Sequence, residues 1–511
     1  MLCYNENMDL FEEGRLTGAP DGGPHKNEFV ALSALDGRYR ALTCPLVDYL
    51  SEAALNRQRI AVELQYLVAL SQGFAVQGFD AESSPVVPGL PKLTHKQVDA
   101  LLSLVSNFNL DSIQELAKIE SRTKHDVKAI EYYIVAKLEK LGVFTPEEFE
   151  KVVKAIHIFC TSEDINNLAY ALCIKGAIFK VIRPRIVKFM RALEEIARTH
   201  ISTPMLARTH GQPATPVTLG KELLVFMHRL NRQLIALDRV EYLGKLNGAT
   251  GSFGAHSIAL PNVKWRKFAK QFVEKRLNLT YNSLTTQIES HDWEVELFSV
   301  LTHINGILHN FATDIWFYIS NEVFIQIPEP GATGSSTMPH KINPIKFENA
   351  EANLELSDAI LSKLSATLVT TRMQRDLTDS SSQRNISSGF AHMLIALENL
   401  TSGISKLTVN TEKLNQELAS NPAVLGEAVQ SVMRVAGIMG CPNMQNPYER
   451  LKEFSRGKTI TLENMRQFVA ELELPEDMKN RLLNLTPEKY IGLCEELCTE
   501  APEEYEAISQ F

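Results

Sequence analysis

A glycine-bracketed segment, residues 331–344, gathers several side chains capable of chemistry. Its sequence is GATGSSTMPHKINP, in which Ser335 supplies a hydroxyl and Lys341 a cation. Its two glycines favour a loop at the start. Asn343 as N-cap and Pro344 as first helical residue favour a helix at the end. Free N–H groups at a helix start would stabilise negative charge on a ligand. An ordinary Gly/Ser surface loop is the alternative.

A histidine in the segment RTHGQPATP, residues 208–216, is the second candidate for chemistry. His210 is followed by a glycine and two prolines, just ahead of a predicted long helix. An imidazole changes charge near neutral pH, so His210 is the best candidate in the chain for proton transfer. Thr209 and Gln212 could orient the imidazole or the substrate. A histidine with a purely structural role is the alternative.

Two clusters combine guanidinium groups with hydroxyls, a combination that suits phosphate. Arg38 is followed by Tyr39, whose ring could also meet an aromatic base. Arg375 and Arg384 lie nine residues apart, with Ser380 between them. A guanidinium recognises phosphate through paired hydrogen bonds. Exposed turns without a ligand are the alternative for both clusters.

A further cluster, Thr-Lys-His-Asp, begins a predicted helix at residue 123. Thr123 and Asp126 have the spacing of a capping box, so a helix start and nothing more is one interpretation. Lys124 and His125 would then lie at the positive end of that helix, which is a natural place for an anion. The second interpretation is therefore a binding site for a negatively charged ligand.

The same capping spacing recurs in the segment TSEDINN, which starts at Thr161. Thr161 and Ser162 could offer hydroxyls to a carboxylate or phosphate, although capping alone could account for the threonine. Asn166 and Asn167 favour helix poorly, which suggests a polar role for them. Gln287 is a further polar interruption ahead of a predicted long helix.

Helical periodicity dominates the rest of the chain. Apolar residues recur three and four positions apart through residues 223–237, 297–315 and 386–407. This spacing is typical of helices with one buried face, and alternating strand patterns are nearly absent. Long helices of this kind pack as near-parallel bundles. The sequence therefore predicts an all-α fold with a central bundle of long helices.

Breaks in the helical pattern divide the chain into an extension and three predicted domains. A chain of 511 residues is too long for one compact core. Residues 1–28 are polar and aperiodic, which indicates a flexible extension. We expect an N-terminal helical domain over residues 29–150 and the central long-helix bundle over residues 151–410. Shorter, more polar helices predict a small C-terminal domain over residues 411–511.

Composition excludes several classes of function. The net charge of −9 gives no polybasic surface for nucleic acid or for an anionic membrane. The seven cysteines contain no CxxC pair, which favours a reducing compartment. No apolar run approaches the roughly 20 residues of a membrane span, and the first residues do not resemble a signal peptide. A cytoplasmic enzyme is expected.

Taken together, the polar segments resemble those of one enzyme family. GSSTMPHKINP is similar to the signature loop of the fumarase/aspartase superfamily, homotetrameric lyases that release fumarate. Argininosuccinate lyase, fumarase, aspartase and carboxymuconate cycloisomerase share most of that loop. DGRY, KHDVKAIEYY, TSEDINN, RTHGQPATP and QRDLTDSSSQRN together resemble the adenylosuccinate lyases, in the form typical of bacterial enzymes. The resemblance runs from about Ser33 to Gly492.

The resemblance implies cleavage of adenylosuccinate to AMP and fumarate, and of succinylaminoimidazolecarboxamide ribotide to aminoimidazolecarboxamide ribotide and fumarate, in purine biosynthesis. It implies a homotetramer whose sites each draw on three chains, nucleotide substrates, and no metal or organic cofactor. It also implies Ser335 as the general base and His210 as the general acid. The substrate-binding residues that it implies are Arg38, Tyr39, His125, Asp126, Thr161, Ser162, Gln287, Lys341, Asn343, Arg375, Ser380 and Arg384.

Releasing fumarate from a succinyl group needs residues of these types. Removing the proton beside a carboxylate leaves an enediolate-like dianion, which Lys341 and loop N–H groups could stabilise. A serine hydroxyl is normally too weak an acid to become the base, so residue types alone favour His125 or His210 for that role. A helix start, Lys341 and the exclusion of water would be needed to activate Ser335. The resemblance alone assigns the base to Ser335.

Two other interpretations are open at this point. One is another fumarate-releasing lyase, such as argininosuccinate lyase, and the other is a helical scaffold that kept the fold without activity. Ser335, His210 and Lys341 together argue against a scaffold, which has no use for them. Lys124 stands where the resembled form usually has asparagine, so no binding role is assigned to it.

Overall fold

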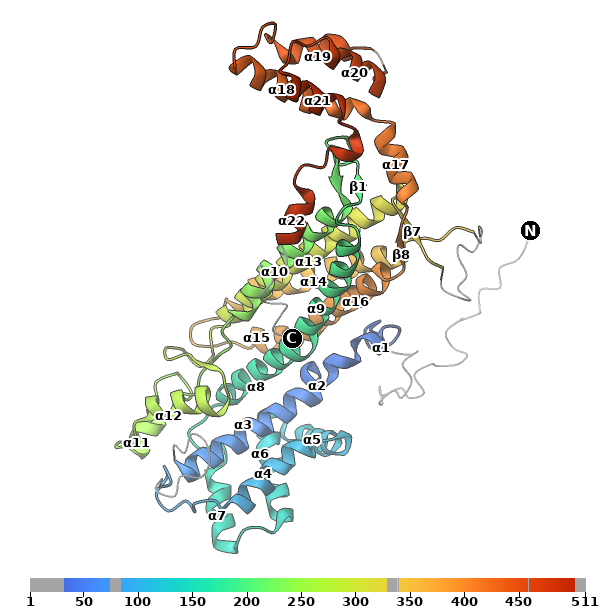
Figure 1. Ribbon diagram of the computed structural model, residues 1–511. Coiled ribbons are helices and arrows are strands. Elements are labelled where there is room, and N and C mark those ends of the chain that lie inside the picture. The colour runs from blue at the N-terminus through green and yellow to red at the C-terminus, as the bar shows by residue number, and fades with distance from the viewer. Residues whose placement is uncertain (1–31, 74–83, 329–337, 339, 458, 501–511) are drawn as a thin grey trace, which may run out of the picture. The chain divides into compact units, whose positions relative to one another are not determined.

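The computed structural model describes residues 32–73, 84–328, 338, 340–457 and 459–500 (Figure 1). Helices make up nearly all of the regular structure in these residues, and the strands are two or three residues long. Within the same residues the strands pair two by two. The predicted all-α fold is confirmed.

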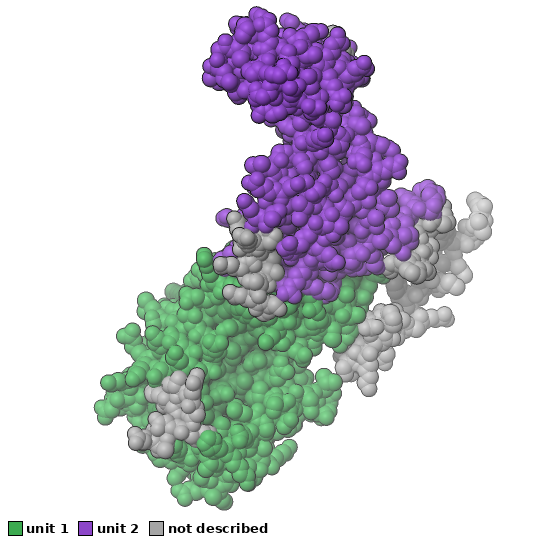
Figure 2. Space-filling view, viewed as in Figure 1, with its two compact units in different colours: residues 1–185, 237–305, 353–396 green, residues 186–236, 306–352, 397–511 purple. Residues whose placement is uncertain are grey.

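The chain divides into two compact units, which Figure 2 shows in separate colours. Unit 1 comprises residues 1–185, 237–305 and 353–396, and unit 2 comprises residues 186–236, 306–352 and 397–511. Each boundary falls inside a long helix. These long helices are α9 (Arg183–Thr199), α10 (Leu219–Asp238), α13 (Asp292–Ser320), α14 (Ile345–Leu368) and α16 (Ile386–Ile404). The division into an extension and three domains stays a prediction.

Unit 1 contains the helices before residue 178 and three short helices from later in the chain. They are α1 (Arg40–Thr43), α2 (Val47–Leu50), α3 (Glu52–Gln72), α4 (His95–Ser106), α5 (Leu110–Thr123), α6 (Asp126–Leu141), α7 (Pro146–Ala155), α8 (Ser162–Ala177), α11 (Gly254–Ala259), α12 (Trp265–Gln271) and α15 (Thr378–Gln383). Its strands β5 (Leu243–Gly244) and β6 (Thr280–Tyr281) pair in parallel. Its shorter helical turns are Cys44–Leu46, Ile178–Ile182 and Phe272–Arg276.

Unit 2 contains the remaining strands and the helices nearest the C-terminus. Its strands are β1 (Pro204–Met205), β2 (Arg208–Thr209), β3 (Gln212–Pro213), β4 (Val217–Thr218), β7 (Phe324–Gln326) and β8 (Leu407–Val409). Its helices are α17 (Thr411–Ala419), α18 (Gly426–Ile438), α19 (Pro447–Ser455), α20 (Leu462–Ala470), α21 (Glu476–Leu483) and α22 (Cys494–Glu500), with short turns at Pro422–Leu425 and Pro487–Lys489.

Unit 1 is built on two apolar helices, α3 and α8, which pack against each other. Ile60 and Leu64 of α3 and Ile165 and Leu168 of α8 are completely buried. Burying one such side chain contributes roughly 1.5–3 kcal/mol to folding. This packing holds the first turn of α8 in place, and that turn carries several of the predicted site residues.

The apolar faces predicted from periodicity are the buried faces of α10, α13 and α16. Leu230 of α10, Phe311 of α13 and Phe390 of α16, for example, are completely buried. The third face ends earlier than predicted, because α16 stops at Ile404 and Leu407 begins β8. The backbone of β8 pairs with β7, which a helical continuation would prevent.

A separate apolar cluster holds the helices that follow residue 425 in unit 2. Val429 and Met433 of α18 pack with Met465 and Val469 of α20 and with Leu482 of α21. All five side chains are buried. Short, otherwise polar helices are thus stabilised by one shared apolar core, since helices of this length are marginal alone.

One helical stretch among the described residues, Ser162–Thr199, is long and apolar enough to cross a membrane by length and composition. Charged residues interrupt it, so no continuous apolar run marks it in the sequence. Of its most apolar window, 72% is buried inside the structure. Such burial is what the core helix of a folded protein shows.

Gly220, at the start of α10, offers a test of the packing in unit 2. A Cβ atom added there would lie 2.5 Å from the carbonyl oxygen of Ala197 and 2.8 Å from that of His200. Because backbone atoms cannot easily move aside, Gly220→Ala should destabilise the fold by about 1–3 kcal/mol. The measurement is the melting temperature, which should fall.

Gly306 of α13 provides the matched control. Among the described residues, no atom beyond its chain neighbours and the adjacent turns of its own helix backbone lies within 4 Å of a Cβ atom added there. Gly306→Ala should therefore keep or raise the melting temperature, since alanine favours a helix over glycine by about 1 kcal/mol. Equal melting temperatures for the two variants would contradict the packing described for Gly220.

Candidate active site

The predicted site residues are distributed over the two units. Unit 1 contains Arg38, Tyr39, His125, Asp126, Thr161, Ser162, Gln287, Arg375, Ser380 and Arg384. Unit 2 contains His210, Ser335, Lys341 and Asn343. Ser335 lies outside the described residues.

The first turn of α8 is held by Asp164, whose carboxylate has no exposed surface. Its Oδ2 atom accepts a hydrogen bond from the Thr161 N–H at 2.9 Å, and the predicted capping box is confirmed. Its Oδ1 atom lies 3.0 Å from the equally buried ammonium of Lys245. The N–H groups of Asn247 and Gly248 donate to the same carboxylate at 3.0 and 3.1 Å. One buried anion thus fixes both the Thr161 corner and the segment after Lys245.

Lys245 is the counter-charge that makes this burial possible. Burial lowers the pKa of the Lys245 ammonium, and the Asp164 carboxylate opposes that shift. The ammonium also donates to the Gly248 carbonyl at 3.0 Å. The Asn167 side chain accepts from the Lys245 N–H at 2.8 Å and donates to the Lys245 carbonyl at 3.1 Å. Helix α8 is therefore joined to this segment at two successive turns.

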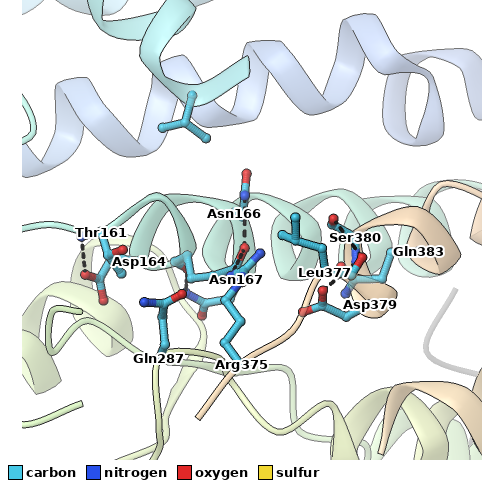
Figure 3. Close-up of polar contacts among 12 residues, drawn as sticks. Thr161, Asp164, Asn166, Asn167, Gln287, Arg375, Leu377, Asp379, Ser380 and Gln383 are labelled. Atoms are coloured by element: carbon cyan, nitrogen blue, oxygen red, sulfur yellow. Dashed lines mark hydrogen bonds and ion pairs between the residues drawn. The ribbon is translucent and has the colours of Figure 1, made fainter. Parts of the chain in front are cut away.

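Gln287 is positioned by the segment that the buried carboxylate holds. Its Nε2 atom donates to the Ala249 carbonyl at 2.8 Å, and the Asn247 amide donates to the Thr285 hydroxyl at 2.8 Å. Gly251 has a positive φ of 73°, and a Cβ atom there would clash with the Thr285 carbonyl oxygen. Figure 3 shows Gln287 facing α8. The amide of Gln287 is thus placed by contacts on neighbouring loops.

Arg375, in the segment before α15, is held by Glu163 of α8. The Arg375 Nη1 atom lies 2.8 Å from the Glu163 Oε1 atom, and only 16% of the Arg375 side chain is exposed. The Asn166 amide donates to the same oxygen at 3.0 Å. Figure 3 shows Arg375 extending toward α8. The guanidinium is therefore presented in one orientation near the turn that carries the half-buried Thr161 and Ser162.

Ser380 lies in α15, a short helix held by a buried histidine. The Ser380 N–H donates to Asp379 Oδ1 at 2.6 Å, and Asp379 Oδ2 lies 3.5 Å from His291 Nε2. His291 Nδ1 lies 3.3 Å from Glu294 Oε1, which also accepts from the Gln383 amide at 2.9 Å. Burial alone would lower the pKa of His291, but hydrogen bonds to Asp379 and Glu294 raise it to about 10. An imidazolium thus pairs with two carboxylates and fixes both ends of α15.

Arg384, the residue after α15, lies against acidic groups of α3 and α6. Its Nη1 atom lies 2.8 Å from Glu52 Oε2, and its Nη2 atom lies 3.7 Å from Asp126 Oδ2. The same Asp126 oxygen lies 2.8 Å from Arg59 Nη2. Burial would raise the pKa of Asp126, but Arg59 and the Val127 N–H, among other neighbours, hold it below its ordinary value. Asp126 is therefore a carboxylate shared by two guanidinium groups.

A hollow of about 470 Å³ opens beside Arg384 in unit 1. Its polar wall includes Arg384, Glu52 and Asp36, and apolar side chains of α2, α8 and α16 form part of the remaining lining. This volume lies within the range of small-molecule sites. Arg38 and Tyr39 follow Asp36 in the chain, and the Arg38 side chain is exposed.

His125 occupies the N-cap of α6, which differs from the sequence prediction. Helix α5 continues through Thr123, and Lys124 ends it in the left-handed conformation with a φ of 54°. Helix α6 therefore begins only at Asp126, and the predicted capping box of Thr123 with Asp126 is wrong. The His125 Nδ1 atom accepts a hydrogen bond from the Lys128 N–H at 3.2 Å. Half of the His125 side chain remains exposed.

In unit 2, His210 lies at the tip of a β-hairpin that the sequence did not predict. Thr209 pairs with Gln212, which leaves His210 and Gly211 as a two-residue turn. Their φ angles are 53° and 73°, as a type I′ turn requires. The His210 side chain is exposed. The turn therefore presents the imidazole outward.

Lys341 and Asn343 lie on the segment before α14. The helix begins at Ile345, so the predicted start at Pro344 is wrong by one residue, a shift common at helix ends. The Ile342 carbonyl, between these two residues, accepts a hydrogen bond from Gln326 Nε2 at 2.9 Å. Lys341 is exposed and Asn343 is half-buried.

Charged residues that the sequence analysis did not single out hold the predicted ones. They are Arg59, Glu163, Lys245, His291 and Asp379. A charged residue within the apolar face of a predicted helix could have indicated them in the sequence, because a buried charge needs a partner. Arg59, for example, lies between the buried residues Leu55 and Ile60 of α3.

Comparison with known families and proteins decides the identity of the fold and of its motifs. Residues 37–355 match the family described as Lyase, and residues 371–491 match the family described as Adenylosuccinate lyase C-terminal. A protein named adenylosuccinate lyase from Legionella pneumophila strain Corby is 43% identical over 467 residues, which cover 91% of this chain and 97% of that one. The chain belongs to the adenylosuccinate lyase family.

Further adenylosuccinate lyases agree with this assignment. The protein of that name from Haemophilus influenzae is 42% identical, and the one from Escherichia coli K12 is 41% identical. Each alignment covers 91% of this chain and 97% of the relative. The resemblance drawn from the polar motifs is therefore confirmed.

Solved structures resemble this fold at lower identity. The 3-carboxy-cis,cis-muconate lactonizing enzyme from Pseudomonas putida has a TM-score of 0.66 at 20% identity, covering 91% of this chain and 97% of that one. The fumarate lyase from Mesorhizobium sp. BNC1 has a TM-score of 0.68 at 18% identity, covering 90% and 97%. Likeness at such identity shows the fold alone, which is the fumarase/aspartase-like fold expected for an adenylosuccinate lyase.

The buried His291 gives the stability of this adenylosuccinate lyase family member a pH dependence. Its pKa is about 10 in the folded chain, against an ordinary value of 6.5. The stabilisation that it contributes is therefore complete below about pH 6.5 and is lost as the pH rises through 10. His291→Gln should lower the melting temperature at neutral pH and reduce the fall of that temperature toward pH 10.

The control is His303→Gln, which changes an exposed histidine on α13, the helix that begins directly after His291. Its melting temperature should follow that of the parent protein across the pH range. If the curve of His291→Gln instead ran parallel to the parent curve, His291 would carry no extra proton in the folded state.

Proposed function

We propose that this chain is an adenylosuccinate lyase of purine biosynthesis, acting in the cytoplasm. It would cleave adenylosuccinate to AMP and fumarate, and succinylaminoimidazolecarboxamide ribotide to aminoimidazolecarboxamide ribotide and fumarate. The observation that carries this proposal is the 41–43% identity to proteins of that name over nearly their whole length. The guanidinium groups gathered in unit 1 support it, because a nucleotide substrate brings a phosphate.

The nucleotide end is proposed to bind along the segment from Arg375 to Arg384. Both guanidiniums are held by carboxylates in the free chain, and Ser380 adds a hydroxyl between them. A phosphate would displace the exposed Glu52 carboxylate from Arg384. Its oxygens would then accept charge-assisted hydrogen bonds from the Arg384 guanidinium. Arg38 and Tyr39 would complete this end of the site.

The succinyl end is proposed to lie where hydroxyls, amides and the Lys341 ammonium can donate hydrogen bonds to the two succinyl carboxylates. Thr161, Ser162 and Gln287 supply fixed hydroxyl and amide donors, and His125, Asp126 and Asn343 would complete the set. Donors fixed before the reaction lower the barrier, because they do not reorganise as charge develops on the enediolate-like intermediate.

The proton transfers are proposed for Ser335 and His210. Ser335 would remove the proton beside the succinyl carboxylate, and His210 would protonate the nitrogen as it leaves. The exposed imidazole at the hairpin tip is free to reach a ligand. Lys341 would favour the alkoxide form of Ser335 as well as the developing dianion.

We further propose a homotetramer in which several chains complete each site. Helices that cross the unit boundaries expose large apolar side chains, and exposed apolar surface of this kind marks protein interfaces. The exposed fractions are 40% for Val225 of α10, 53% for Phe317 of α13, and 60% and 50% for Ile345 and Leu356 of α14. Packing of these helices between chains would bury them.

A turnover assay with candidate substrates tests the proposed activity. Purified protein is mixed with adenylosuccinate, and its absorbance and the fumarate formed are followed. Cleavage of adenylosuccinate without cleavage of argininosuccinate is expected. Fumarate release from argininosuccinate alone would replace the proposal with that activity, and release from neither would leave a helical scaffold.

Two inactive variants test the shared site. Ser335→Ala and His210→Ala should each reduce turnover by more than about a thousandfold, because each removes one proton-transfer group. After mild dissociation and reassociation together, the mixture should regain a measurable part of the parent activity. Some sites of a hybrid tetramer then receive both parent residues from different chains.

Ser336→Ala is the control for the serine position and should keep turnover within about tenfold of the parent, a barrier change of about 1.4 kcal/mol. Mass spectrometry of the mixture establishes that hybrids formed. Hybrids that form and stay inactive would place the base and the acid in one chain.

A further inference from the structure

Arg59 of α3 is a buried cation that the proposed reaction does not use. Only 2% of the residue is exposed, although a guanidinium carries a full charge. Its Nε atom donates to Asn166 at 2.9 Å, its Nη1 atom donates to Asn56 at 2.8 Å and its Nη2 atom donates to Asp126 at 2.8 Å. Each nitrogen of the fork therefore has a partner, and these partners lie on α3, α6 and α8.

One set of these contacts leads to Arg384. Asp126 Oδ2 is shared by the two guanidiniums, at 2.8 Å from Arg59 and 3.7 Å from Arg384. Glu52 is shared as well, at 3.8 Å from Arg59 and 2.8 Å from Arg384. The buried arginine has the shorter contact with the carboxylate of Asp126, and Arg384 has the shorter contact with the half-exposed Glu52.

The second set leads to Arg375. Asn166 receives a hydrogen bond from Arg59 on its oxygen, which turns its amide nitrogen toward Glu163 at 3.0 Å. Glu163 in turn pairs with Arg375 at 2.8 Å. The buried guanidinium of Arg59 is thus linked to Arg384 through one intermediate side chain and to Arg375 through two.

We propose that Arg59 is a positioning residue for the nucleotide end of the site, an inference that rests on the proposed binding of phosphate by Arg375 and Arg384. Arg59 satisfies the charge of Asp126, so that Arg384 is left with a carboxylate that can move away when phosphate arrives. Without the fork of Arg59, Asp126 would draw Arg384 toward itself, because Arg384, at 3.7 Å, would be the guanidinium left beside that carboxylate. Arg384 would then be withheld from phosphate.

The test is Arg59→Lys in the full-length chain, measured by calorimetry with AMP and by steady-state kinetics with adenylosuccinate. Lysine keeps the charge but cannot reach three partners at once. AMP affinity should fall and KM should rise by about tenfold or more, whereas kcat should change less than about threefold, since binding common to ground and transition states is lost. Arg57→Lys, two residues away on the same helix, is the matched control and should bind AMP as the parent does.

A double variant distinguishes positioning from general damage. If Arg59 acts through Arg384, then Arg59→Lys combined with Arg384→Lys should bind AMP at most about threefold more weakly than the worse single variant. Losses that multiply in the double variant, or an Arg59→Lys protein with AMP affinity within about threefold of the parent, would overturn the inference.

A charge-balanced pair covers the case in which Arg59→Lys does not fold. Arg59→Gln with Asp126→Asn removes the buried guanidinium and its carboxylate partner together. It should bind AMP more tightly than Arg384→Lys does, because position 126 then carries no charge to draw Arg384 away. Equal weakness of the two proteins would overturn the inference. The parent protein alone tests the proposed function, through its cleavage of adenylosuccinate and its binding of AMP. If the parent does both and the variants behave otherwise than expected, only the inference about Arg59 fails.

Discussion

The ion pair between Asp164 and Lys245 is the interaction on which the rest of the described site depends. Both charges are fully buried, and removing one partner of such a pair costs about 3–5 kcal/mol because the other is left unpaired. Asp164 also receives three backbone N–H groups. The start of α8 and the segment after Lys245 therefore cannot separate without stranding two charges. Thr161, Ser162 and Gln287 take their fixed positions from this constraint.

Helix α8 joins stability to the proposed chemistry. Its apolar residues pack on α3, whereas Glu163 in its first turn pairs with Arg375 and the Asn166 amide oxygen accepts a hydrogen bond from Arg59. His291 pairs with the two carboxylates that hold α15. The segment with two guanidiniums is thus fixed by buried opposite charges rather than by regular structure, since α15 is too short to be stable by itself.

The sequence predicted the long helices well, because repeated spacing of apolar residues reports directly on which face is buried. It also predicted the capping of α8, which is a local interaction. It did not predict the hairpin that carries His210, because strands of two residues leave no periodic signal. The left-handed backbone conformation of His210 gives no signal either, since it is imposed by the surrounding structure. Arg59 and His291 were missed for a similar reason: their partners, Asp126 and Asp379, are distant in the chain.

The central claim is that Arg375 and Arg384 receive the phosphate of a nucleotide while buried neighbours hold them in place. A crystal structure of the protein with AMP bound tests it most directly. The phosphate oxygens should lie within hydrogen-bonding distance of both guanidiniums, with Glu52 displaced from Arg384 and Asp126 still paired with Arg59. A phosphate bound away from both guanidiniums, with the Glu52 contact intact, would contradict the claim.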